Sequence, residues 1–141
     1  MFRDIKKEQP DPAIIQLLAA CVYENSPERA QSAAEEYRTR HNRDLFGWVE
    51  NGEIIGMCGF RVYHTDRVVV THIATRSQDR GRGIGQQIIQ ALQAEFLLPI
   101  HAETDDDAVG FYRKLGFETT AFEKTGHRRW ACVLEVPHAK L

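Results

Sequence analysis

The spacing of apolar and polar residues predicts a mixed chain that opens with a short strand and two helices. Asp11-Pro12 and Ser26-Pro27 each place a capping side chain before a proline, which is typical of a helix start. Apolar residues follow at helical spacing, so we expect helices over 12–23 and 27–40. A weaker pattern before them suggests a first strand over residues 2–7.

The period changes to two after residue 44, which indicates strands. Two alternating runs, 45–50 and 53–64, flank Asn51-Gly52, the strongest two-residue signal for a hairpin turn. A third run, 67–75, is rich in β-branched residues and predicts a central strand. On the second strand, one apolar face is expected to carry Ile54, Cys58, Phe60 and Val62.

The rest of the chain alternates helices and strands and ends in a strand pair. Its predicted elements are a helix over 84–96, a strand over 99–104, a helix of about ten residues that Asp105 caps and Gly116 ends, and strands over 117–124 and 128–136. We therefore expect one α/β domain over residues 1–141, with a mixed, mostly antiparallel sheet of about seven strands and about four helices on both faces.

Composition narrows the function classes. A formal charge of −2 and a pI near 6.3 argue against nonspecific nucleic-acid binding, which needs many cationic contacts to phosphate. The three cysteines are widely spaced without a CxxC pair, so we expect reduced thiols and no metal site. No apolar run reaches membrane-spanning length. These features together predict a cytoplasmic protein that binds neither nucleic acid nor membrane.

The residues best suited to binding a ligand are concentrated between the third predicted strand and the helix predicted over 84–96. Gly81, Gly83 and Gly85 occupy alternate positions there, which suits a backbone that cradles a phosphate at a helix N-terminus. Arg80 and Arg82 add positive charge. A Rossmann dinucleotide site fails on glycine spacing and on the preceding three-strand meander, and a Walker loop fails for want of Gly-Lys-Ser/Thr.

Two motifs resemble those of the GNAT superfamily of N-acetyltransferases. One is Arg80-x-x-Gly83-x-Gly85, which is similar to the pyrophosphate-binding signature of that family. The other is the run 108–117, AVGFYRKLGF, which resembles the family's helix with alanine, tyrosine and Leu-Gly-Phe. Their separation and the order of elements also fit, over roughly residues 45–136.

This resemblance implies that acetyl-CoA binds in a splayed cleft between the strand ending near Thr75 and the strand 99–104. The backbone of residues 73–75 would pair with the pantetheine arm, and the loop 81–85 would hold the pyrophosphate. Arg80 would contribute to the loop, and Arg82 would make outer phosphate contacts. Asp105 replaces an asparagine that often contacts pantetheine, and a carboxylate cannot donate that bond. The implied cofactor-binding residues are Ile73, Ala74, Thr75, Arg80, Gly81, Arg82, Gly83, Ile84, Gly85, Asp105 and Tyr112.

The resemblance also implies direct attack of an amine on the thioester. It assigns Tyr112 the protonation of the thiolate leaving group, for which a phenol with a pKa near 10 is suited. Three residues are candidates for the base: His72 in the central strand, and His101 and Glu103 across the cleft, of which Glu103 is preferred because it also attracts a cation. Regular alternation would place His72 on the face opposite Thr71 and Ile73.

The expected function is transfer of an acetyl group to a primary amine of a small molecule, without a metal. Two alternatives stay open: a module on the same fold that binds acetyl-CoA or CoA without turnover, and an enzyme that acetylates a protein or peptide. The sequence does not distinguish acetyl-CoA from another acyl-CoA, and it leaves a homodimer open.

Overall fold

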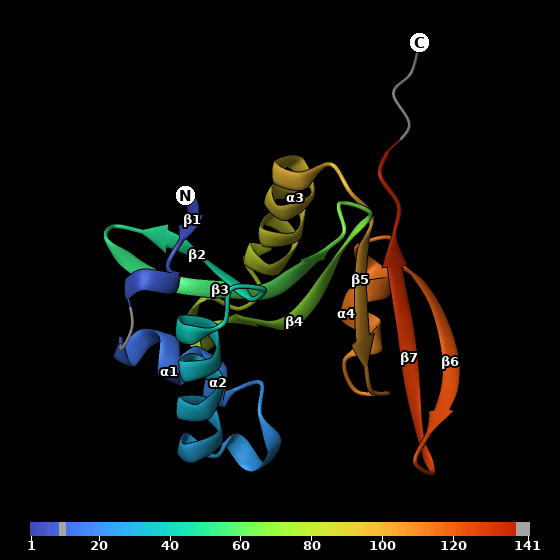
Figure 1. Cartoon of the computed structure of the whole chain (residues 1–141), viewed down its shortest axis with the longest axis horizontal. Helices are drawn as coiled ribbons and strands as arrows, with labels where there is room; N and C mark the ends of the chain where they lie inside the picture. The colour runs from blue at the N-terminus through green and yellow to red at the C-terminus, as the bar shows by residue number, and fades with distance from the viewer. Residues whose placement is uncertain (9–10, 138–141) are drawn as a thin grey trace.

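The computed structural model describes residues 1–8 and 11–137, and within them the chain forms one seven-stranded sheet with helices on both faces (Figure 1). The strand order is β1-β2-β3-β4-β5-β7-β6, and all neighbours are antiparallel except β4 and β5. The strands are β1 (Phe2–Asp4), β2 (Asp44–Glu50), β3 (Glu53–Tyr63), β4 (Arg67–Thr75), β5 (Ile100–Thr104), β6 (Glu118–Lys124) and β7 (His127–Leu134). The α-helices are α1 (Pro12–Ala19), α2 (Pro27–Thr39), α3 (Ile84–Phe96) and α4 (Val109–Lys114), and short 3-10 turns are η1 (Lys6–Glu8), η2 (Tyr23–Asn25) and η3 (Ser77–Asp79).

Both predicted helix starts are confirmed. Asp11 Oδ1 accepts the N–H of Ala13 at 2.8 Å, and Ser26 Oγ accepts the N–H of Arg29 at 3.2 Å. The elements nearby are shorter than predicted. The first strand ends at Asp4, and α1 ends at Ala19 because the chain tightens into three-residue turns and then into positive φ at Glu24.

The predicted hairpin is confirmed, but one predicted face of β3 is wrong. Asn51 and Gly52 have φ of 51° and 78°, the left-handed pair that a primed turn needs. The β2–β3 register then shifts between Trp48 and Val49. This irregularity moves Ile54 to the opposite face from Cys58, so Ile54 packs among residues of α1 and α2.

The sheet separates two apolar clusters. In Figure 1, α1 and α2 lie together on one side of β3 and β4, and α3 lies on the other. The α1/α2 cluster contains Ile14, Leu17, Leu18, Ala30, Ala34, Tyr37 and Met57. The α3/α4 cluster contains Ile84, Ile88, Leu92, Val109, Tyr112, Cys58 and Cys132, and it confirms that these two cysteines are core residues.

The two parallel strands separate soon after they meet. Only two residue pairs join β4 to β5, Val68 with Ile100 and Val69 with His101. Beyond Val69, the edge of β4 that faces β5 has no strand partner among the described residues, and Figure 1 shows the two strands diverging. The predicted splay of the sheet is therefore present.

The helix after the split is shorter than predicted. Asp105 Oδ1 accepts the N–H groups of Asp107 and Ala108 at 3.1 and 3.0 Å, so a polar turn precedes α4. As predicted, Gly116 takes a left-handed φ, 93°, just past the end of the helix. Within residues 1–8 and 11–137, no helix is both long and apolar enough to cross a membrane.

Candidate active site

Two of the three loop glycines have backbone dihedrals that favour glycine. Gly81 and Gly83 have φ of 84° and 77°, and a Cβ atom on either would meet nothing within 4 Å. The requirement is therefore conformational and not steric. Gly83 is the N-cap of α3, and no side chain caps that helix. The N–H groups of its first turn are thus left without a side-chain cap, which suits a phosphate anion.

Gly85 has a different role from the other two. A Cβ atom there would lie 2.8 Å from Cε1 of Phe111. Glycine at this position allows the ring from α4 to pack on the first turn of α3 beside the loop. The third glycine of the motif therefore allows close contact between α3 and α4.

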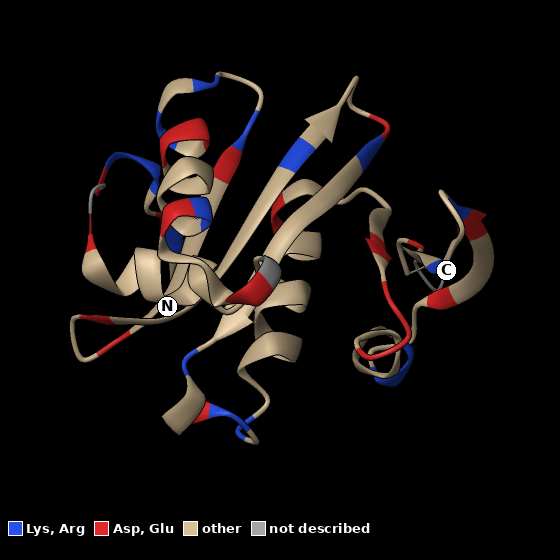
Figure 2. Ribbon diagram, turned by 90° about the horizontal axis from the view of Figure 1, so that it is seen from below, with Lys and Arg blue, Asp and Glu red and all other residues tan. Residues whose placement is uncertain are grey.

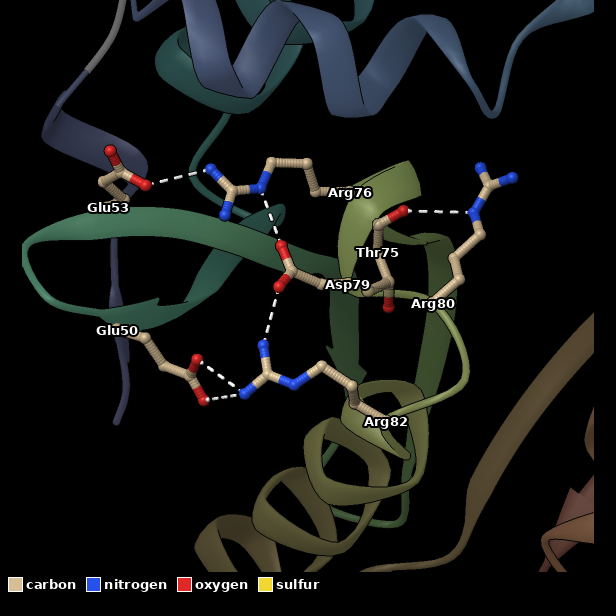
Figure 3. Close-up of polar contacts among 7 residues, drawn as sticks. All are labelled: Glu50, Glu53, Thr75, Arg76, Asp79, Arg80 and Arg82. Atoms are coloured by element: carbon tan, nitrogen blue, oxygen red, sulfur yellow. Dashed lines mark hydrogen bonds and ion pairs between the residues drawn. The ribbon is translucent and has the colours of Figure 1, made fainter.

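The two loop arginines also differ. Arg82 donates to Glu50 at 2.8 Å and to Asp79 at 2.6 Å, and Arg76 donates to the same Asp79 at 2.7 Å and to Glu53 at 3.0 Å (Figure 3). Together, Arg76, Asp79, Arg82, Glu50 and Glu53 form an ion-pair clamp that ties the loop to the β2–β3 hairpin. Acidic and basic segments accordingly alternate along this loop in Figure 2.

Arg80 lies outside this clamp. Within the part of the chain that the structure describes, the one polar contact of its side chain is the Nε bond to the Thr75 carbonyl at 3.4 Å. Its side chain is exposed, whereas Asp79 is buried. Arg80 is therefore the loop cation whose charge no carboxylate offsets, and Arg82 mainly holds the loop in place.

Replacing Asp79 with asparagine is expected to lower the melting temperature at pH 7, because two neighbouring guanidinium groups would lose the carboxylate they share. Hydrogen bonds from Arg76 and Arg82 hold the pKa of Asp79 below its ordinary value, although burial acts in the opposite direction. A depressed carboxyl pKa stabilises the fold above the unfolded value of 3.8, and this stabilisation is lost as pH falls through the folded value.

Differential scanning calorimetry at pH 7 and near pH 3 measures this effect, and the difference from wild type should shrink in acid. Asp66→Asn is the matched control, because Asp66 is exposed and its one ion pair with the described residues is to its neighbour Arg67. Equal melting temperatures for the Asp79 variant and wild type at pH 7 would contradict the clamp.

The strand segment predicted to pair with pantetheine borders the split. The side chain of Ile73 packs on the α3/α4 cluster, and that of Ala74 on the α1/α2 cluster. The Ile73 carbonyl accepts the thiol of Cys21 at 3.4 Å. Because this edge of β4 has no strand partner beyond Val69, an extended ligand can pair with it as an added strand.

Tyr112 belongs to the apolar cluster that includes residues of both separated strands. It packs in the same cluster as Val70 and Ala102, the first residues of β4 and β5 beyond their last pair. Burial raises the pKa of its phenol, with smaller contributions from nearby cysteines, so the proton stays on the oxygen at neutral pH. The hydroxyl makes no hydrogen bond with any described residue. A buried phenol with a free proton is suited to donate to a leaving group.

Glu103 is held by cations. Lys124 Nζ lies 3.3 Å from its carboxylate and Arg129 Nε lies 3.1 Å from it. Partial burial raises the pKa of Glu103, but hydrogen bonds from Arg129 and Lys124 outweigh it and leave the pKa below its ordinary value. A carboxylate in this state is a weak proton acceptor. Asp106 is similarly engaged, by Arg128 at 2.9 Å and by the indole N–H of Trp130 at 2.7 Å, on the acidic turn visible in Figure 2.

His72 differs from Glu103 because no carboxylate among the described residues pairs with it. The hydroxyl of Tyr37 lies 2.5 Å from its Nδ1 and also contacts Oγ1 of Thr71. The β3–β4 register shifts here, since Gly59 pairs with His72 and Phe60 with Val70, leaving Thr71 without a partner. The expectation that Thr71 and His72 face opposite sides is therefore wrong: the bulge lets both contact a residue of α2.

Tyr37 lies at an apolar position of the helix predicted over 27–40, and helical spacing alone does not predict its contact with β4. Tyr37 reaches β4 by passing over Gly59, where a Cβ atom would lie 1.9 Å from its hydroxyl oxygen. An isolated glycine within a strand is a known sign of close approach by another segment. Gly59 was thus the available signal for this feature.

Gly59→Ala is expected to destabilise the fold by about 1–3 kcal/mol, because the new methyl group forces Tyr37 out of its site in the core. Urea unfolding measures the change. Gly110→Ala is the control, since a Cβ atom at Gly110 would meet nothing within 4 Å. In α4 the control should be neutral or slightly stabilising. Unfolding curves that coincide for Gly59→Ala and wild type would show that Tyr37 can relax away without cost.

Comparison with known proteins agrees with this architecture. The family model for the acetyltransferase (GNAT) family matches residues 12–117. An uncharacterized N-acetyltransferase in the lysA 3′ region of Bacillus methanolicus is 32% identical over 77 residues, a match that spans 55% of this chain and 64% of that protein.

Solved structures share the fold at low identity. An aminoglycoside 6′-N-acetyltransferase complexed with coenzyme A superposes with a TM-score of 0.76 at 16% identity, covering 99% of both chains. A GNAT family acetyltransferase from Elizabethkingia anophelis with acetyl-CoA bound gives a TM-score of 0.70 at 17% identity, covering 96% of this chain and 97% of that one. With the family match over three quarters of its length, the chain belongs to the acetyltransferase (GNAT) family.

Proposed function

We propose that this protein transfers an acetyl group from acetyl-CoA directly to a primary amine of a small molecule. The observation that carries the proposal is the split between β4 and β5, with a left-handed glycine loop after β4 and Tyr112 in the apolar cluster that includes residues of both strands. The residues present fit the cofactor: Gly81, Gly83 and the uncapped start of α3 suit the pyrophosphate, and the free edge of β4 suits pantetheine. Arg80 adds the unpaired charge.

When bound, acetyl-CoA supplies a thioester whose carbonyl carbon accepts the amine nitrogen. His72 Nε2 takes one proton from the acceptor ammonium, which leaves the neutral amine to form the C–N bond. Tyr112 gives its phenol proton to the sulfur as the C–S bond breaks, and the second proton lost by nitrogen restores the phenol. The net products are an acetyl amide, a CoA thiol and one proton, which His72 passes to solvent.

Support for a small-molecule acceptor comes from the neighbours, since an aminoglycoside 6′-N-acetyltransferase is among them. An identity of 16% shows only that the two proteins share a fold, so the choice of a small-molecule acceptor is our proposal. Glu103 and Asp106 are neutralised by arginine and lysine partners, so neither provides a free negative charge for a cationic acceptor.

The test is release of free CoA from acetyl-CoA across a panel of small amines, amino acids and short peptides. Thermal stabilisation by acetyl-CoA is measured in parallel. We expect stabilisation, together with CoA release for at least one small amine. Stabilisation without turnover on any acceptor would favour a binding module, turnover on peptides alone would favour a protein acetyltransferase, and no stabilisation would contradict the cofactor site.

A further inference from the structure

Tyr37 is a buried polar side chain that the chemistry above does not use. It lies in the last turns of α2 and is 1% exposed. Small residues on the same face, Ala30 and Ala34, allow the helix to pack closely on the sheet. Gly59 then leaves room for the phenol to cross β3. Ala30, Ala34 and Gly59 thus allow the Tyr37 side chain to reach from α2 to β4.

The Tyr37 hydroxyl contacts two consecutive residues of β4. Tyr37 lies against Thr71 Oγ1 and against His72 Nδ1, the latter at 2.5 Å, and its ring meets the imidazole edge-on at 5.5 Å. In a regular strand, consecutive side chains point to opposite faces. The bulge at Thr71 is therefore what makes the three-residue contact possible.

We propose that Tyr37 is a positioning residue that holds His72 with a proton on Nδ1 and leaves Nε2 free to take the proton of the acceptor ammonium. The inference rests on the proposed function for its catalytic meaning. It also predicts the tautomer of His72 in the free protein, which can be tested without any acceptor.

Two sets of donor directions satisfy the proton inventory, because either hydroxyl can donate in the contact between Tyr37 and Thr71. Burial is the main cause that raises the pKa of Tyr37, so the phenol keeps its single proton. In the proposed arrangement that proton is donated to Thr71 Oγ1, and the phenol oxygen accepts from Nδ1–H of His72. This arrangement serves both charge states, because imidazolium also donates from Nδ1. His72 can therefore gain and lose a proton at Nε2 while the Tyr37 contact stays in place.

The surroundings favour a neutral imidazole in the resting state. Burial and then the Arg43 cation lower the pKa of His72, and Glu36 opposes them. Arg43 and Glu36 lie 3.6 Å apart as an ion pair, and Cys58 and Cys21 are the other titratable groups near Tyr37. Nε2 makes no hydrogen bond with any residue that the structure describes. It is the ring nitrogen left available for proton transfer.

The tautomer is measured by ¹⁵N NMR of the imidazole nitrogens in the free protein, with histidine labelled and His72 assigned by its absence in His72→Gln. Above its pKa, wild-type His72 should show a protonated Nδ1 and an unprotonated Nε2. Tyr37→Phe keeps the ring but removes the acceptor, so the proton should move substantially to Nε2. Thr71→Val should weaken the preference for Nδ1, and Thr71→Ser should restore it.

Turnover should follow the tautomer. Tyr37→Phe is expected to lower kcat by about tenfold or more, with KM for acetyl-CoA unchanged, because the orienting partner of the base is lost. Tyr63→Phe is the matched control, since Tyr63 contacts Arg61 and Arg67 at the end of β3. Its tautomer spectrum and rate should equal those of wild type.

Three results would overturn the proposal: a wild-type Nε2–H tautomer, an unchanged tautomer in Tyr37→Phe, or a changed tautomer with full activity. A confirmed tautomer with full activity in His72→Gln would instead refute the proposed base. The spectra are recorded without acetyl-CoA or acceptor, so failure of the hydrogen-bond chain and failure of the proposed reaction give distinct results.

Discussion

Tyr112→Phe should lower the single-turnover rate of acetyl transfer by about 10²- to 10⁴-fold, the range for loss of a general acid. The ring fills the same space, so its edge contacts with Phe111 and Phe117, at 5.1 and 5.2 Å between centroids, persist. The hydroxyl makes no hydrogen bond within the described chain, so its removal leaves no partner unsatisfied. The loss should therefore appear in the chemical step and not in folding.

The measurement is rapid-quench transfer at saturating acetyl-CoA, which separates chemistry from product release. Calorimetric titration of acetyl-CoA should give a Kd close to wild type. Tyr63→Phe repeats the same substitution outside the site and should leave both quantities unchanged. A Tyr112→Phe enzyme with the wild-type rate would remove Tyr112 from the mechanism.

Features that depend on a few adjacent residues were predictable from the sequence. Asp11-Pro12, Ser26-Pro27 and Asn51-Gly52 form their caps and turn as expected, because each uses dihedrals and side chains within about four positions. The same holds for the left-handed conformations of Gly81 and Gly83. Local chemistry determines these structures before any packing occurs.

Features that depend on distant partners were not predictable. Arg82 appeared free in the sequence, but the β2–β3 hairpin brings Glu50, 32 positions away, to within hydrogen-bonding distance. Glu103 appeared to be a usable base, but strand register places Arg129 and Lys124 beside it. In both cases the sequence shows the charged residue but does not show the oppositely charged partners that the fold brings to it.

The bulge at Thr71 shows a third limit. One extra residue in β4 reverses which side chains share a face from that point, and no local pattern marks its position. The sequence does contain one related signal, Gly59, where a side chain is excluded because Tyr37 crosses the strand at that point. A close approach was therefore inferable, but its partner was not.

His72→Gln should lower kcat/KM by about a hundredfold, because the amide cannot take the ammonium proton. Burial and Arg43 lower the pKa of His72 from its ordinary value of 6.5, while Glu36 raises it. The base is then neutral at pH 7, and wild-type kcat/KM should fall only as pH drops below 6.5. The assay should use an acceptor amine whose ammonium pKa lies well above this range, so that the protonation state of the acceptor does not change over the pH values measured. The variant should lose this acid limb.

Glu103→Gln provides the discriminating comparison, since its carboxylate is paired with two cations and its pKa is lowered. If His72 is the base, the Glu103 variant keeps both the rate and the acid limb of wild type. If Glu103 is the base, that variant loses both and His72→Gln keeps them. The native state also favours neutral His72, so stability should decline as pH falls from about 6.5, and His72→Gln should abolish that decline. Loss of both the acid limb of the rate and the acid decline of stability in His72→Gln would identify one imidazole as the source of both.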